Sequence, residues 1–204
     1  DNVGDNVGDV AGMGADLFDS NVASMAAALV MSTALDKAVG GDRYTVMVFC
    51  YAALGLLASI IGVMAARIGK NGNPTGALNS STYVTTAVYM VLTAIATAIW
   101  GLEWRIWGAC IVGLLVGVII GIATDYFTDD RKKPVQFVAH ASKSGPAFTI
   151  LSGISYGFLS VLPAMIGIGI SALVAYKLCE PINPAYAGEF AMFGISMAAV
   201  GMLS

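Results

Sequence analysis

Aspartates recur at regular intervals through the first nineteen residues of the chain. Five of the thirteen acidic residues lie there, at positions 1, 5, 9, 16 and 19. On a helix with about 100° per residue, these five side chains share an arc of about 80° and spread over roughly 27 Å along the axis. The spacing therefore predicts a stripe of carboxylates along one helix, which we call the acidic stripe: Asp1, Asp5, Asp9, Asp16 and Asp19.

Carboxylates placed one helical turn apart suit hard divalent cations. Mg²⁺ prefers oxygen ligands in octahedral geometry and commonly bridges carboxylates and substrate phosphates. Gly4, Gly8 and Gly12 lie beside the acids and allow a neighbouring helix or a ligand to approach closely. Like charges along a helix repel one another and are expensive in a bilayer, so cations must neutralise them. The stripe indicates a metal-rich acidic site that opens into an ion path.

Other interpretations of the stripe follow from its spacing. A calcium loop of the EF-hand type needs acids at positions 1, 3 and 5 and a glutamate at 12, whereas the period here is four. A solvated helix end would explain Asp1 and Asp5, but not Asp16 and Asp19, which enter an apolar run. An ion path without chemistry, as in a channel or a secondary transporter, remains open from the spacing alone.

The composition identifies the surroundings of this helix. Of the 204 residues, 57% are hydrophobic and 11% are charged, and the mean hydropathy is +0.79. A soluble domain has about a quarter of its residues charged, and a soluble core of this size cannot hide so much apolar surface. Ten Lys and Arg face thirteen Asp and Glu, for a net charge of −3, which argues against a nucleic-acid partner. We expect an integral membrane protein.

The apolar runs predict an all-α, polytopic transmembrane bundle. Each run has about 20 residues, the length that a helix needs to cross the hydrocarbon, whereas transmembrane strands alternate over about ten. The longest polar segment, residues 125–144, is expected to be a loop. We expect five complete spans and the start of a sixth, forming a single transmembrane region, at residues 1–35, 45–66, 83–102, 106–123, 147–176 and 188–204.

Cations between the spans predict the orientation of the chain. The loops after the second and fourth spans hold six Lys and Arg, and those after the first, third and fifth hold four. The positive-inside bias then places the N-terminal end on the cytoplasmic side. The chain opens on Asp1 and closes within an apolar run, so we interpret it as an internal piece of a longer protein.

Residues 1–18, DNVGDNVGDVAGMGADLF, closely resemble the signature of the membrane-integral, ion-pumping inorganic pyrophosphatases. The resemblance extends along the chain and is strongest at the first helix. Further stretches similar to that family are residues 76–79 (GALN), 144–147 (SGPA), 150–153 (ILSG) and 198–204 (AAVGMLS).

The resemblance implies hydrolysis of pyrophosphate coupled to transport of H⁺ or Na⁺, with Mg²⁺ as the cofactor and K⁺ as a candidate activator. It implies a homodimer in a lipid membrane, with about sixteen helices per subunit, each about 20 residues long, and a hydrolytic site facing the cytoplasm. The chain is similar to the sixth helix through the start of the eleventh. The membrane would be the plasma membrane of a prokaryote, or an acidic organelle's membrane in a eukaryote. The fragment alone would be inactive.

The resemblance also implies roles for individual residues. Asp1, Asp5 and Asp9 would hold Mg²⁺ on pyrophosphate. Asp5 and Asp9 would be catalytic, with Asp9 positioning and deprotonating the attacking water.

Residues further along the same helix would form the ion pathway. Asp16 would join an ion-pair network below the hydrolytic site. Asp19 occupies the place where many members carry a gate glutamate, and Asn21 replaces the aromatic residue that usually follows the gate. Apart from the resemblance, Ser20 lies near the face of the stripe, where it would line the path.

Overall fold

The computed structural model describes residues 2–65 and 74–203, and these residues form helices and turns without a strand. Six of the helices are long and apolar enough to cross a membrane, which confirms the predicted all-α, polytopic fold. The α-helices are α1 (Asn2–Val39), α2 (Arg43–Ala65), α3 (Pro74–Ile99), α4 (Trp104–Thr128), α5 (Lys133–Ala141), α6 (Pro146–Cys179) and α7 (Ala187–Leu203).

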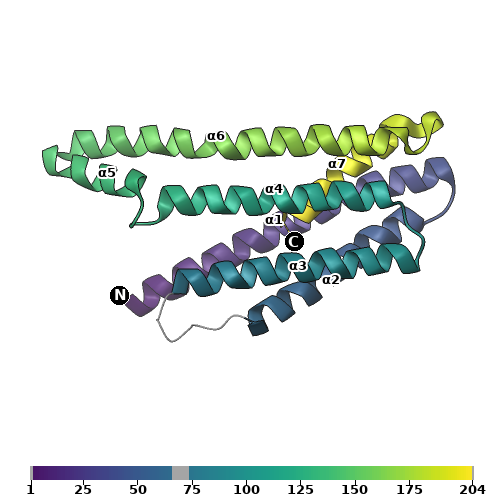
Figure 1. Ribbon diagram of the computed structural model, residues 1–204, viewed down its shortest axis with the longest axis horizontal. Coiled ribbons are helices and arrows are strands. Elements are labelled where there is room, and N and C mark those ends of the chain that lie inside the picture. Colours follow the sequence, from purple (N-terminus) through teal and green to yellow (C-terminus); the bar gives the residue numbers. More distant parts are fainter. Residues whose placement is uncertain (1, 66–73, 204) are drawn as a thin grey trace.

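The long helices pack side by side, and α7 crosses among them (Figure 1). Helix α7 contacts α4, α6 and α1, while α2 pairs with α3. Glycines make the crossing of α4 and α7 close. A Cβ at Gly113 would collide with the backbone of Ala198, and one at Gly201 would collide with the backbone of Cys110. Small residues at such crossings let the backbones of membrane helices approach.

Hydroxyl groups connect α2, α3 and α4 inside the bundle. Tyr51 Oη lies 2.6 Å from Thr97 Oγ1, and the indole Nε1 of Trp107 donates to Thr93 Oγ1 over 3.1 Å. Polar groups in hydrocarbon need partners within the protein. These bonds satisfy the groups and fix α2 and α4 against α3.

Two helices are much longer than the membrane is thick. Helix α1 has 38 residues and α6 has 34, about 57 Å and 51 Å at 1.5 Å per residue, against about 30 Å of hydrocarbon. The turns that join α1 to α2, α3 to α4, and α6 to α7 lie together at one end of the bundle (Figure 1). The excess length of α1 and α6 therefore lies at the opposite end, beside the N-terminus and α5.

The expectation of a loop over residues 125–144 is wrong. Helix α4 continues to Thr128 and α5 follows after a short turn. The apolar side of α5 packs on α6, where the rings of Phe137 and Tyr156 lie 5.5 Å apart. Contact with α6, together with burial of Pro134, supports a helix that the surrounding charged residues conceal in the sequence.

Candidate functional site

The acidic stripe lies on the exposed half of α1. Between residues 3 and 20, each residue whose side chain is described is exposed, including Asp5, Asp16 and Asp19. Asp1 and the side chain of Asp9 fall outside the described residues. Helix α1 runs without interruption from Asn2 to Val39, so one continuous helix carries the described part of the stripe.

The length of α1 places the stripe relative to the membrane. Twenty residues, about 30 Å of helix, separate Lys37 from Leu17. If the hydrocarbon begins at Lys37, where the turns meet, a span of this length ends near Asp16 and Asp19. Asp5 lies about 15 Å or more beyond that boundary.

One face of the other half of α1 is buried against neighbouring helices. Ala28 and Leu35 are fully buried, and Asp36 is 6% exposed. The carboxylate of Asp36 accepts hydrogen bonds from the backbone N–H groups of Tyr44, at 3.0 Å, and Thr45, at 2.9 Å. These donors belong to the first turn of α2, whose free N–H groups favour an acceptor with negative charge. Asp36 therefore clasps the end of α1 to the start of α2.

Sequence reasoning missed the clasp. Asp36 and Lys37 look like two charged residues of a turn, because they stand beside Gly40 and Gly41. The sequence signal for the clasp was an acid shortly before a new helix. Such an acid can cap the N–H groups of that helix when a tight turn reverses the chain. Both glycines have positive φ, 86° and 138°, which permits that turn.

Arg43 extends the clasp to the third helix. Its guanidinium Nη2 donates to the carbonyl oxygen of Trp100 at 3.1 Å and also to that of Gly101. These carbonyls lie at the C-terminal end of α3, where a cation is favourable. The C-terminal ends of α1 and α3 and the start of α2 are therefore held together, at the end of α1 opposite its exposed half.

Polar side chains near Asp19 bond to their own helix. Ser20 Oγ donates to the carbonyl oxygen of Asp16 at 2.9 Å, and Asn21 Nδ2 donates to that of Leu17 at 3.2 Å. Their remaining lone pairs can still face a passing cation. A cavity of about 420 Å³ begins beside Asn21 and continues between α1, α2 and α7, and its lining contains no acid. This cavity does not extend the line of carboxylates.

The stripe offers ligands from one side only. Within the part of the chain that the structure describes, no group of three or more His, Cys, Asp or Glu side chains is placed to hold a metal ion. The donor type nonetheless fits Mg²⁺, since exposed carboxylate oxygens on successive turns are the ligands that this cation takes. A complete Mg²⁺ site requires further ligands facing this half of α1.

These features define an integral membrane protein of several helices, one of which presents a line of carboxylates. The chain belongs to the inorganic H⁺ pyrophosphatase family, because the sequence model described as "Inorganic H+ pyrophosphatase" matches residues 1–204. The fold class and the family inferred from residues 1–18 are therefore both confirmed.

Known relatives include pumps for two different ions. The chain is 42% identical, over its full length, to a "Putative K(+)-stimulated pyrophosphate-energized sodium pump" of Clostridium tetani and covers 29% of that protein. It is 34% identical over its full length to a "K(+)-insensitive pyrophosphate-energized proton pump" of Caldanaerobacter subterraneus and covers 30% of it. A further sodium pump, putative and K⁺-stimulated, from Bacteroides thetaiotaomicron is 38% identical. The chain thus spans less than a third of these relatives.

Proposed function

We propose that this chain forms part of a pump that hydrolyses inorganic pyrophosphate and moves H⁺ or Na⁺ across a membrane. The observation that carries the proposal is the exposed half of α1, where carboxylates recur on an unbroken helix and have no partner among the described side chains. Relatives matched over the full chain are named pyrophosphate-energized pumps. An unpaired acidic face needs cations, and a pyrophosphate site supplies a reason for them.

The carboxylates near the N-terminus would form the hydrolytic part of the site. Asp1, Asp5 and Asp9 would hold Mg²⁺, which when bound neutralises the substrate and polarises its phosphoryl oxygens. Asp9 would also orient the attacking water and accept its proton, because a carboxylate near cations stays ionised. Asp5 sits one turn before Asp9 and would keep the substrate in line with that water.

The carboxylates further along would form the start of the ion path. Asp16 and Asp19 lie near the membrane boundary on the same helix as the hydrolytic acids. A change of charge at Asp9 would act on a cation at Asp19 through about 15 Å of rigid helix. Ser20 would line this path with its free lone pairs. Asp19 has one methylene fewer than the glutamate of many family members, which would alter the fit of the transported ion.

The setting of the site follows from charge and from the relatives. The positive-inside bias supports a cytoplasmic position for the N-terminal end of α1. The membrane would be the plasma membrane of a prokaryote. The family resemblance supports a homodimer.

K⁺ is proposed as an activator, because two of the sodium-pump relatives are named K⁺-stimulated. Addition of K⁺ should raise the hydrolytic rate, and an unchanged rate contradicts K⁺ activation.

The test uses the whole protein that contains this chain, reconstituted in sealed vesicles. Release of phosphate from pyrophosphate should require Mg²⁺, and Na⁺ or H⁺ should accumulate inside the vesicles only while pyrophosphate is present. Ion flux without hydrolysis would favour the competing function, a channel or secondary transporter. The 204-residue chain alone should release no phosphate above a protein-free control.

A second experiment separates hydrolysis from transport. Asp19→Ala in the whole protein should retain hydrolysis and lose ion accumulation. Asp42→Ala, an exposed acid at the other end of the bundle, is the matched control and should leave both unchanged. Ion accumulation at the wild-type rate in Asp19→Ala would contradict the proposed path.

A further inference from the structure

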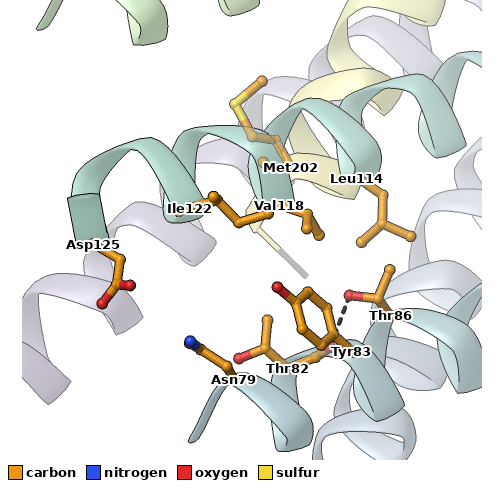
Figure 2. Close-up of a pocket in the computed structure, with 11 residues that line it drawn as sticks. Asn79, Thr82, Tyr83, Thr86, Leu114, Val118, Ile122, Asp125 and Met202 are labelled. Atoms are coloured by element: carbon orange, nitrogen blue, oxygen red, sulfur yellow. Dashed lines mark hydrogen bonds between the residues drawn. The ribbon is translucent and has the colours of Figure 1, made fainter. Parts of the chain in front are cut away.

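A second polar site lies apart from the acidic stripe, in a cavity between α3 and α4. The cavity has a volume of about 280 Å³, and Met202 near the end of α7 contributes to its lining. Figure 2 shows Asn79 and Asp125 at one end of the cavity, with Tyr83 between them and the apolar residues. The lining is therefore polar at one end and becomes apolar toward Val118 and Leu114.

The polar end lies at the depth of lipid headgroups. Helix α3 ends at Ile99 and α4 begins at Trp104, at the end of the bundle where the turns meet. Counting about 20 residues, or 30 Å, from each of these positions reaches Asn79 on α3 and Thr124 on α4. Asn79 and Asp125 therefore lie at the same boundary of the hydrocarbon. The apolar end lies within the hydrocarbon.

The polar end carries a negative charge that nothing described in the chain neutralises. Asp125 is half-buried, and its carboxylate has no ion pair or hydrogen bond with any described residue. Arg131, the first cation that follows Asp125 in the sequence, lies 4.0 Å from Asp130 instead. A carboxylate beside hydrocarbon is costly without a cationic partner. The site therefore favours a ligand that brings a positive charge.

The neighbouring side chains specify how the ligand would bind. Thr82 and Thr86 donate their hydroxyl protons to the carbonyl oxygens of Leu78 and Thr82, so the hydroxyl oxygens remain as acceptors. Asn79 Nδ2 and Tyr83 Oη provide donors toward the cavity. An ammonium group would satisfy Asp125 and the threonine oxygens, and a phosphate would satisfy Asn79 and Tyr83.

We propose that this cavity binds a phospholipid with a primary amine in its headgroup, of the phosphatidylethanolamine type. The ammonium lies on Asp125, the phosphate lies near Asn79 and Tyr83, and one acyl chain follows Val118 and Ile122. An anionic headgroup would be repelled by Asp125. A choline headgroup has a quaternary nitrogen that cannot donate hydrogen bonds. The inference goes beyond the proposed pump activity, since it assigns a lipid site whose lining contains no residue of the stripe.

The test measures which lipids remain on the whole protein. The protein is reconstituted with equal amounts of phosphatidylethanolamine and phosphatidylcholine, extracted in mild detergent, and its retained lipids are quantified by mass spectrometry. Wild-type protein should retain the amine lipid about tenfold over the choline lipid, the factor expected for one charge-assisted hydrogen-bonded contact. Asp125→Asn should bring the ratio close to one. Asp130→Asn, an exposed acid outside the cavity, is the matched control and should retain the tenfold preference.

A second variant tests the apolar end independently of the charge. Ile122→Trp fills the path of the acyl chain and should also lower retention of the amine lipid, while the variant remains monodisperse. Equal retention by wild type, Asp125→Asn and Ile122→Trp would overturn the proposal.

Two further measurements test other occupants. Thr82→Cys should react with a membrane-soluble maleimide, and absence of reaction would mean that another part of the whole protein covers the cavity, which overturns the proposal. Thermal stabilisation by Na⁺ that is lost in Asp125→Asn, without any lipid preference, would assign the site to an inorganic cation and also overturn it.

Discussion

The two halves of α1 share one continuous helix but have opposite surroundings. Residues 3–20 are exposed wherever their side chains are described, whereas Ala28 and Leu35 are fully buried and Asp36 is nearly so. The carboxylates of the exposed half have no cation beside them in the described chain, while the carboxylate of Asp36 accepts two backbone hydrogen bonds. Aspartates of the exposed half are therefore free to bind cations, whereas Asp36 in the other half joins two helices.

The largest expected effect is a loss of hydrolytic activity when a carboxylate of the exposed half of α1 is neutralised. Asp5→Asn in the whole protein should lower the rate of Mg²⁺-dependent phosphate release about 10²- to 10⁴-fold, or about 3–5 kcal/mol of transition-state stabilisation, because a metal-binding carboxylate becomes neutral. The melting temperature should stay unchanged. Asp42→Asn serves as the control with normal activity. A loss below threefold would remove Asp5 from the site.

The next effect should appear in stability. Asp36→Ala removes the acceptor for the N–H groups of Tyr44 and Thr45, which should cost about 1–3 kcal/mol of unfolding free energy. Thermal unfolding of the detergent-solubilised protein measures the loss. Asp42→Ala, six residues further along and exposed, should melt like the wild type. If both variants melt at the wild-type temperature, the clasp does not stabilise the fold.

A smaller effect tests whether the buried side of the bundle depends on single hydrogen bonds. Tyr51→Phe removes the 2.6 Å contact with Thr97, and such bonds between membrane helices contribute about 0.6 kcal/mol. The melting temperature should fall slightly, and phosphate release should be unaffected. Tyr126→Phe, on the surface of α4 and partly exposed, is the control that should show no change.

The smallest effect concerns the boundary between the two halves. Ser20 already donates its hydroxyl proton to the backbone of Asp16, so Ser20→Ala should change stability by less than about 0.5 kcal/mol. Ion accumulation in vesicles should fall by no more than about twofold. A loss as large as that of Asp19→Ala would show that the hydroxyl group itself binds the transported ion.

The exposed half was the part that the sequence could predict. The spacing of Asp5, Asp16 and Asp19 depends only on the repeat of one helix, and lengths of about 20 apolar residues reveal spans without any tertiary information. The family followed from residues 1–18.

The parts that could not be predicted depend on how helices meet. The clasp at Asp36 needs the chain to reverse at Gly40 and Gly41, and α5 needs the surface of α6. The cavity at Asp125 lies between α3 and α4, with Met202 of α7 in its lining, whereas Asp125 alone resembled the first residue of a polar loop. Such features arise from packing between segments, which hydrophobic periodicity along one segment does not contain.

The clasp at Asp36 makes α1 a lever. Thirty-one residues separate Asp36 from Asp5, so the arm between them is about 46 Å long. A tilt of only about 5° around the clasped end would carry Asp5 sideways by about 4 Å, more than the length of a bond between Mg²⁺ and oxygen. The same tilt would move Asp19, nearer the fulcrum, by about half as much. A movement of Asp5 when its ligand binds or leaves would thus reach Asp19 as a smaller displacement with a larger force.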